Sequence, residues 1–180
     1  MSSQSGFPLD QALLGFLMQG PVHGYALHDR AEGELGRIWY MGMSNVYGTL
    51  KQLEEAGHVE STLDDETYPP RKVYTVTPEG RARFRAWVRE PVPAMRDMRV
   101  EFLAKLYFFH TLELTGVEAL LEAQRGVCRQ RLDQLARGRR GSPRTEGGTD
   151  DPFDRIVDAF RRRRIEASLE WLHMVESDWA

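Results

Sequence analysis

Apolar residues recur at helical spacing along most of the chain, and stretches rich in Gly and Pro divide them into segments. Residues 8–19 carry one apolar stripe, and residues 23–36 predict a second, shorter helix. A third helix is expected over 44–56, where apolar residues fall at i, i+4 and i+7 and Ser44 is a candidate N-cap. The first third of the chain therefore predicts three short helices.

Two stretches rich in β-branched residues follow these helices, at 58–65 and 71–77. The acidic, proline-containing sequence DDETYPP lies between them, which predicts a hairpin with a loop longer than a tight turn. Thr77-Pro78-Glu79 then begins another helix, with a capping residue, a proline at the first helical position and an acidic residue near the positive end of the helix dipole. Three helices, a hairpin and a fourth helix form the order of a winged helix-turn-helix domain.

The second half of the chain has a different pattern, because it consists of long helical stretches over 96–112, 117–137 and 153–177. The intervening residues 138–152 are dense in Gly, Ser, Pro and charged residues, which predicts a mobile loop. Pro91 and Pro93 mark the natural boundary between the two halves.

Three helices alone make a thin core for a segment of this length, and an identical chain is the simplest partner that completes it. We therefore expect a homodimer. Its interface is expected to include the apolar residues Phe102, Leu106, Phe153, Val157, Phe160 and Leu172. The fold class predicted is mainly α with a small β-hairpin: a winged helix-turn-helix domain at 1–92, followed by a C-terminal α-helical dimerisation domain at 93–180.

Composition and charge narrow the class of protein further. The 180 residues include one cysteine, Cys128, which excludes an internal disulfide and fits a reducing compartment. Neither a signal peptide nor an apolar run of membrane-spanning length is present in the sequence, so we expect a soluble cytoplasmic protein with no membrane partner. The net charge of −3, and 9 Lys and Arg against 12 Asp and Glu in residues 1–90, give no support to a nucleic-acid partner.

Candidate chemistry lies on the polar face of the third helix. Asn45 can make a bidentate pair with adenine, whereas Ser44 and the amides at the helix start can hold a phosphate. Tyr47 and Lys51 are candidate phosphate contacts, which position a protein on DNA without specifying sequence. The alternative is a solvated polar face on an ordinary core helix.

The hairpin adds a second group of cations. Arg71 and Lys72 begin its returning strand, where a cation would meet a DNA phosphate. Alternatively, they pair with the acidic residues 64–66 across the loop, and exposed ion pairs of this kind contribute little energy.

Catalytic or metal chemistry is not indicated by the sequence. The five histidines are scattered, and Glu170 and His173 form one E-x-x-H, which is half of the motif that a carboxylate-bridged metal site needs. The sequence contains no Gly-rich phosphate loop, nucleophile elbow or metal-spaced Cys/His cluster. We expect neither an enzyme nor a metal or cofactor.

Three stretches of this sequence resemble the landmarks of the PadR family of bacterial transcriptional regulators: LLGFLMQGPVHGYAL, SNVYGTLKQLEEAGHVE and RKVYTVTPEGRARF. The later stretches VEFLAKLYFF and EWL are similar to the C-terminal helical domain of the long form of that family. The resemblance implies a dimeric winged-helix repressor. It implies DNA contacts by Tyr25, Ser44, Asn45, Tyr47, Lys51, Arg71 and Lys72. Gly48 departs from the family pattern, which has proline there.

The function expected is sequence-specific binding to a double-stranded operator, an inverted repeat that matches the two-fold symmetry of a dimer. The resemblance suggests release by a small aromatic or amphipathic effector. Candidate effector-binding residues, for which an ordinary core role is the alternative, are Tyr107, Phe108, Phe109, Phe160 and Trp171. The second hypothesis is a winged-helix protein-interaction module that acts through its dimer without binding DNA.

Overall fold

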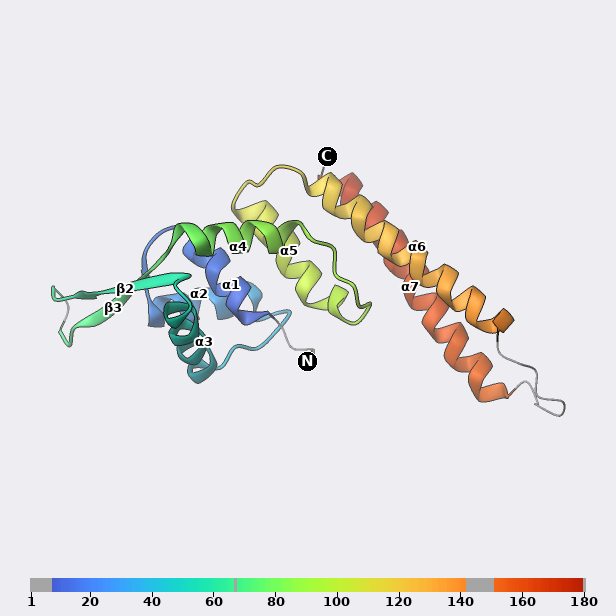
Figure 1. The fold of residues 1–180 in the computed structure, drawn as a ribbon, viewed down its shortest axis with the longest axis horizontal. Coiled ribbons are helices and arrows are strands. Elements are labelled where there is room, and N and C mark those ends of the chain that lie inside the picture. The colour runs from blue at the N-terminus through green and yellow to red at the C-terminus, as the bar shows by residue number, and fades with distance from the viewer. Residues whose placement is uncertain (1–7, 67, 142–150, 180) are drawn as a thin grey trace. The chain divides into compact units, whose positions relative to one another are not determined.

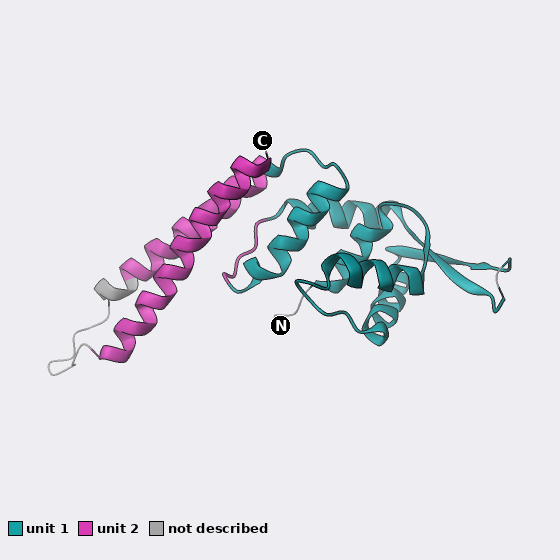
Figure 2. Cartoon of the chain, turned by 180° about the vertical axis from the view of Figure 1, so that it is seen from behind, with its two compact units in different colours: residues 1–90, 96–117 teal, residues 91–95, 118–180 magenta. Residues whose placement is uncertain are grey.

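The computed structural model describes residues 8–66, 68–141 and 151–179. The chain divides into two compact units, which Figure 2 shows in different colours. Unit 1 consists of the residues up to 90 together with 96–117, and unit 2 consists of 91–95 together with the residues from 118 onwards.

Unit 1 contains the predicted order of three helices, a hairpin and a fourth helix (Figure 1). Its elements are α1 Leu9–Leu17, β1 Val22–His23, α2 Gly24–Leu35, α3 Met43–Glu55, β2 Val59–Asp64, β3 Arg71–Val76, α4 Pro78–Arg89, the short 3-10 helix η1 Asp97–Arg99, and α5 Glu101–Thr111. The predicted fold class, a winged helix-turn-helix with further α-helices, is confirmed.

The core of unit 1 is built around α1, in which every residue except Asp10 is buried. Helices α2, α3 and α4 pack against it. The ring of Phe108 on α5 stands edge-on to Phe16 and Phe84, with centroids 5.3 Å away in both cases. Gly15 makes room for these rings, because a Cβ there would lie 2.6 Å from Phe108. This aromatic cluster fixes α5 to the winged helix.

The sheet of unit 1 differs from the predicted hairpin, because it has three antiparallel strands in the order β1-β3-β2. The hairpin register pairs Val59 with Val76 and Asp64 with Arg71. The additional strand, β1, is two residues long and pairs with β3. A strand of two residues has no periodicity of its own, so only tertiary pairing reveals it.

Two predicted helix starts have different outcomes. Thr77 caps α4 as predicted, since its hydroxyl accepts a hydrogen bond from the Gly80 amide at 3.1 Å. The prediction that Ser44 caps α3 is wrong, because the helix begins at Met43 and its N-cap is Gly42. Ser44 instead lies in the exposed first turn of α3.

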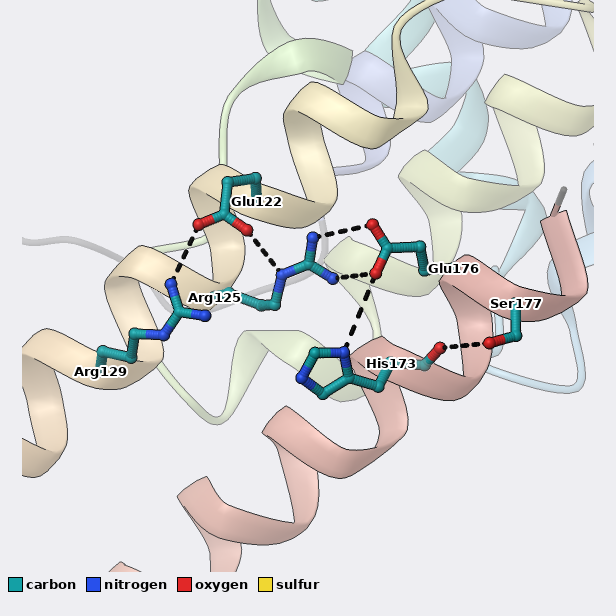
Figure 3. A network of polar contacts seen from close by, with 6 residues as sticks. All are labelled: Glu122, Arg125, Arg129, His173, Glu176 and Ser177. Carbon is teal, nitrogen blue, oxygen red and sulfur yellow. Dashed lines mark hydrogen bonds and ion pairs between the residues drawn. The ribbon is translucent and has the colours of Figure 1, made fainter.

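Unit 2 is an antiparallel pair of long helices, α6 Val117–Gly141 and α7 Pro152–Trp179 (Figure 1). Figure 3 shows the ion-pair network that joins them. The guanidinium of Arg125 donates to both carboxylate oxygens of Glu176, at 2.7 and 3.0 Å, and to Glu122 at 2.8 Å. These hydrogen bonds hold the pKa values of both carboxyl groups below their usual range.

The segment 91–95 belongs to unit 2 because the side-chain amide of Gln124 bonds both the amide and the carbonyl of Val92, at 2.7 and 3.1 Å. The compact units therefore differ from the predicted domains, since 96–117 packs with the winged helix. The division at residue 92 remains a prediction about function. Of the predicted loop 138–152, residues 142–150 lie outside the described part of the chain, and α6 extends to Gly141.

Within the described ranges, no helix has the length and apolarity required to cross a bilayer. In the same residues, no group of three or more His, Cys, Asp and Glu side chains is arranged to hold a metal ion.

Candidate nucleic-acid interface

A concave surface of about 930 Å³ lies where the start of α2, the exposed face of α3 and the wing β2–β3 meet. In Figure 1, α3 lies beside this hairpin, which extends from the helices of unit 1. The residues that line the hollow are His23, Gly24, Tyr25, Tyr47, Lys51, Glu54, Glu55, Pro70, Arg71, Lys72 and Tyr74.

Five of the seven predicted DNA-contacting residues line this hollow: Tyr25, Tyr47, Lys51, Arg71 and Lys72. The other two, Ser44 and Asn45, are exposed on the first turn of α3. The structure thus brings together side chains from α2, α3 and the wing that are far apart in the sequence.

The ring of Tyr47 is positioned by a close approach to the start of α2. A Cβ on Gly24 would lie 2.8 Å from Cε1 of this ring, so a larger residue at position 24 would displace the ring. Beneath the hollow, Tyr74 is buried, and its burial raises the pKa of its hydroxyl.

Lys72 on the wing does not pair with the acidic residues 64–66, which was the alternative drawn from the sequence. Its ammonium pairs with Glu54 on α3, at 3.2 Å, rather than with the acidic residues of the wing loop. Asp64 instead faces the ring of His23, at 3.4 Å. Arg71 is exposed and lies opposite Asp64 in the strand register.

The hollow carries charges of both signs and is not strongly basic. Three cations, Lys51, Arg71 and Lys72, line it together with two carboxylates, Glu54 and Glu55. Glu55 faces Lys51 at 3.8 Å, and both side chains are exposed. The roles of Glu54, Tyr74 and Gly24 were missed from the sequence. No local sequence pattern points toward Glu54, because its contacts with Ser61 and Lys72 depend on the strand register.

The candidate effector residues are distributed over both units. Phe108 and Phe109 are fully buried in unit 1, and Tyr107 beside them is half-buried. Burial, with a hydrogen bond to Glu34, raises the pKa of Tyr107 to about 12. In unit 2, Phe160 is 60% exposed and Trp171 is half-buried.

The candidate dimer residues fall into two groups. Phe102, Leu106 and Leu172 are buried within the protomer. By contrast, Phe153 and Phe160 on α7 are 67% and 60% exposed, and Val157 between them is half-buried. The second group therefore presents an apolar surface, whereas the first packs inside the chain.

Comparison with known proteins gives two family matches. Residues 13–86 match the transcriptional regulator PadR-like family, and residues 98–178 match the family described as virulence activator alpha C-term. The negative transcriptional regulator PadR of Bacillus subtilis is 29% identical over 128 residues, which cover 71% of this chain and 70% of that protein. A probable transcriptional regulator of Mycobacterium tuberculosis is 30% identical over 92 residues, which cover 51% of this chain and 49% of that protein.

Solved structures of similar fold include two complexes of Bacillus subtilis PadR. The complex with operator DNA is 24% identical with a TM-score of 0.47, and the match covers 93% of this chain and 95% of that chain. The complex with p-coumaric acid is 25% identical with a TM-score of 0.42, at the same coverage. The relatives are transcriptional regulators rather than enzymes. Residues 13–86 thus carry the PadR-like domain of a transcriptional regulator, and the match over 98–178 fits the C-terminal helical region of the long form of that family.

Proposed function

We propose that this chain is a dimeric, sequence-specific repressor that binds operator DNA through α3 and the wing. The observation that carries the proposal is the convergence of Tyr25, Tyr47, Lys51, Arg71 and Lys72 on one concave surface. Cations and aromatic hydroxyls on such a surface suit phosphate contacts. Repression follows the Bacillus subtilis relative, which is a negative transcriptional regulator.

In this proposal, α3 enters the major groove with its first turn toward the bases. Asn45 reads an adenine, and Ser44 holds a neighbouring phosphate together with the amides of the helix start. Arg71 and Lys72 on the wing contact the backbone, and the protein acts in the cytoplasm, where bacterial DNA is. We assign DNA binding to residues 1–92.

We assign dimerisation and effector binding to residues 93–180. The exposed Phe153 and Phe160 and the half-buried Val157 support an apolar contact with a second copy along α7. A two-fold dimer places two recognition helices on half-sites about one helical turn apart, or a multiple of it, so the operator is an inverted repeat.

The effector proposed is a small aromatic or amphipathic molecule. Its binding shifts the dimer toward a state whose recognition helices no longer match the operator spacing. The relative from Bacillus subtilis has been solved with p-coumaric acid, which is of this class. Tyr107, Phe160 and Trp171 are the candidates with accessible surface, whereas Phe108 and Phe109 belong to the core.

The test is selection of duplexes from a random pool, followed by titration of variants against the selected duplex. We expect an inverted repeat to emerge. Lys51→Ala should weaken binding to all duplexes and reduce the salt slope by about 0.9 per protomer. Asn45→Ala should relax preference at one base pair by about 1–3 kcal/mol. Arg85→Ala on α4, which removes an exposed cation outside the hollow, is the matched control and should leave binding unchanged.

A second candidate function, a protein-interaction module without DNA binding, is favoured by the carboxylates of Glu54 and Glu55 within the hollow. Salt dependence separates the two, because phosphate neutralisation makes affinity fall steeply with salt. If no sequence emerges from the selection, and Lys51→Ala and Arg85→Ala behave alike, the assignment of the recognition helix is wrong.

A further inference from the structure

One carboxylate links the recognition helix to both strands of the wing. Glu54, in the last turn of α3, accepts a hydrogen bond from the hydroxyl of Ser61 on β2 at 2.5 Å. The same carboxylate accepts from the ammonium of Lys72 on β3, at 3.2 Å to Oε2 and 3.4 Å to Oε1. The three residues therefore join three elements at a single point.

The strand register explains why Ser61 and Lys72 reach the same carboxylate. Ser61 lies opposite Tyr74, and Lys72 lies opposite Leu63, so the two residues are diagonal neighbours on one face of the hairpin. Because the hairpin extends from the helices (Figure 1), this contact with α3 limits how the wing can move against the recognition helix.

Glu54 occupies a position at which a helix disfavours negative charge. The carbonyl end of α3 carries a partial negative charge, and the last turn of this helix contains no basic residue. Hydrogen bonds from Ser61 and Lys72 offset this unfavourable interaction with the helix end, and they hold the pKa of the Glu54 carboxyl below its usual range. The carboxylate is therefore ionised at neutral pH.

Lys72 can contact a DNA phosphate while its ammonium remains paired with Glu54. Half of its side chain is exposed, against one third of the side chain of Glu54. An ammonium has three donors, so it can keep its contact with Glu54 and donate to a phosphate at the same time. The adjacent negative charge also weakens the attraction of this surface for any phosphate backbone.

We propose that Glu54 is a positioning residue for DNA selectivity: it holds Lys72 and the wing in a fixed relation to α3, and its charge lowers the affinity for DNA of the wrong sequence. This inference rests on the proposed function. DNA with the operator sequence presents a phosphate where the held ammonium of Lys72 lies. Other DNA binds more tightly when this ammonium is released and the negative charge of Glu54 is removed.

The test compares Glu54→Gln with Glu55→Gln in the full chain, by fluorescence-anisotropy titration with the selected duplex and a scrambled duplex. Glu55→Gln is the matched control, because it removes the same charge from the same hollow at a carboxylate that faces Lys51 instead of the wing. Glu54→Gln should raise affinity for the scrambled duplex by about two- to fivefold and leave affinity for the selected duplex unchanged or lower. Glu55→Gln should raise both affinities equally.

Two further variants separate positioning from a general loss of structure. Ser61→Ala changes no charge but removes one hydrogen bond to the Glu54 carboxylate. It should therefore lower selectivity, as Glu54→Gln does, while the salt slope stays that of the wild-type chain. When Glu54→Gln is added to Lys72→Met, it should no longer reduce selectivity, because the ammonium that Glu54 positions is already absent. With the scrambled duplex, Glu54→Gln alone should steepen the salt slope by up to about 0.9 per protomer, which a merely structural defect would not do.

Equal effects of Glu54→Gln and Glu55→Gln on the two duplexes would overturn this inference and leave the proposed function intact. Persistence of the Glu54→Gln effect without Lys72 would also overturn it. If the wild-type chain binds neither duplex at low salt, the proposed function fails and the inference fails with it.

Discussion

Phe108 provides the sharpest test of how the winged helix and α5 are held together. From the sequence it is a candidate for an effector pocket, whereas in the structure it is fully buried. Its ring stands edge-on to Phe16 and Phe84, with centroids at 5.3 Å, and at 5.1 Å from Tyr107. Replacement by alanine therefore opens a cavity between α1, α4 and α5.

The expected cost follows from this burial. Truncation of a fully buried phenylalanine to alanine lowers the free energy of unfolding by about 3–5 kcal/mol. For a chain of 180 residues, 1 kcal/mol corresponds to about 2–4 °C, so Phe108→Ala should lower Tm by about 6–20 °C. Phe108→Leu retains most of the volume and should cost no more than about 1.5 kcal/mol.

The assay is thermal and urea denaturation followed by circular dichroism, at one fixed protomer concentration because dimerisation contributes to stability. Tyr40→Ala is the control, since it removes a ring that is 73% exposed in the same unit and should change stability by less than about 0.5 kcal/mol. Equal costs for Phe108→Ala and Tyr40→Ala would refute the packing of α5 on the winged helix.

Two further predictions concern the DNA-facing hollow and the helix pair of unit 2. Gly24→Ala should displace the ring of Tyr47 and lower affinity for the selected duplex by about fivefold, with little change in Tm, whereas Gly33→Ala, whose Cβ meets open space, should leave affinity unchanged. The folded-state pKa of Glu176 lies below its usual value of 4.5 because of Arg125, so its stabilising contribution is present above that pH and is lost as pH falls through the folded-state pKa. Tm should therefore decrease as the pH falls below 4.5, and decrease less in Arg125→Met; equal pH dependence in the two proteins would exclude this role for the ion pair.

Local sequence patterns predicted the elements of this fold because most of them depend on neighbours along the chain. The helical period, the β-branched strands and the cap at Thr77 are all encoded within a few residues. β1 escaped prediction because a strand of two residues exists only through its pairing with β3. The assignment of α5 to the second domain ignored its aromatic contacts with α1 and α4, which no local pattern contains.

The candidate site was predicted in part for the same reason. The exposed face of α3 and the cations at the start of β3 follow from periodicity, and the structure brings these two groups together around one hollow. The partner of Lys72 was missed, because Glu54 precedes it by 18 residues and belongs to a different element. Side-chain pairing between elements depends on strand register and helix packing, which one sequence does not specify.

DNA recognition by α3 and the wing is decided by the affinity of the wild-type chain for the selected and scrambled duplexes at about 50 and about 200 mM salt. Lys51, Arg71 and Lys72 from two protomers would neutralise six phosphates, which gives a salt slope of about −5 and a loss of about 10³-fold over this range. We expect that loss, together with preference for the selected duplex at both salt concentrations. Equal affinity for both duplexes, or a loss of less than about tenfold, would contradict DNA recognition by α3 and the wing.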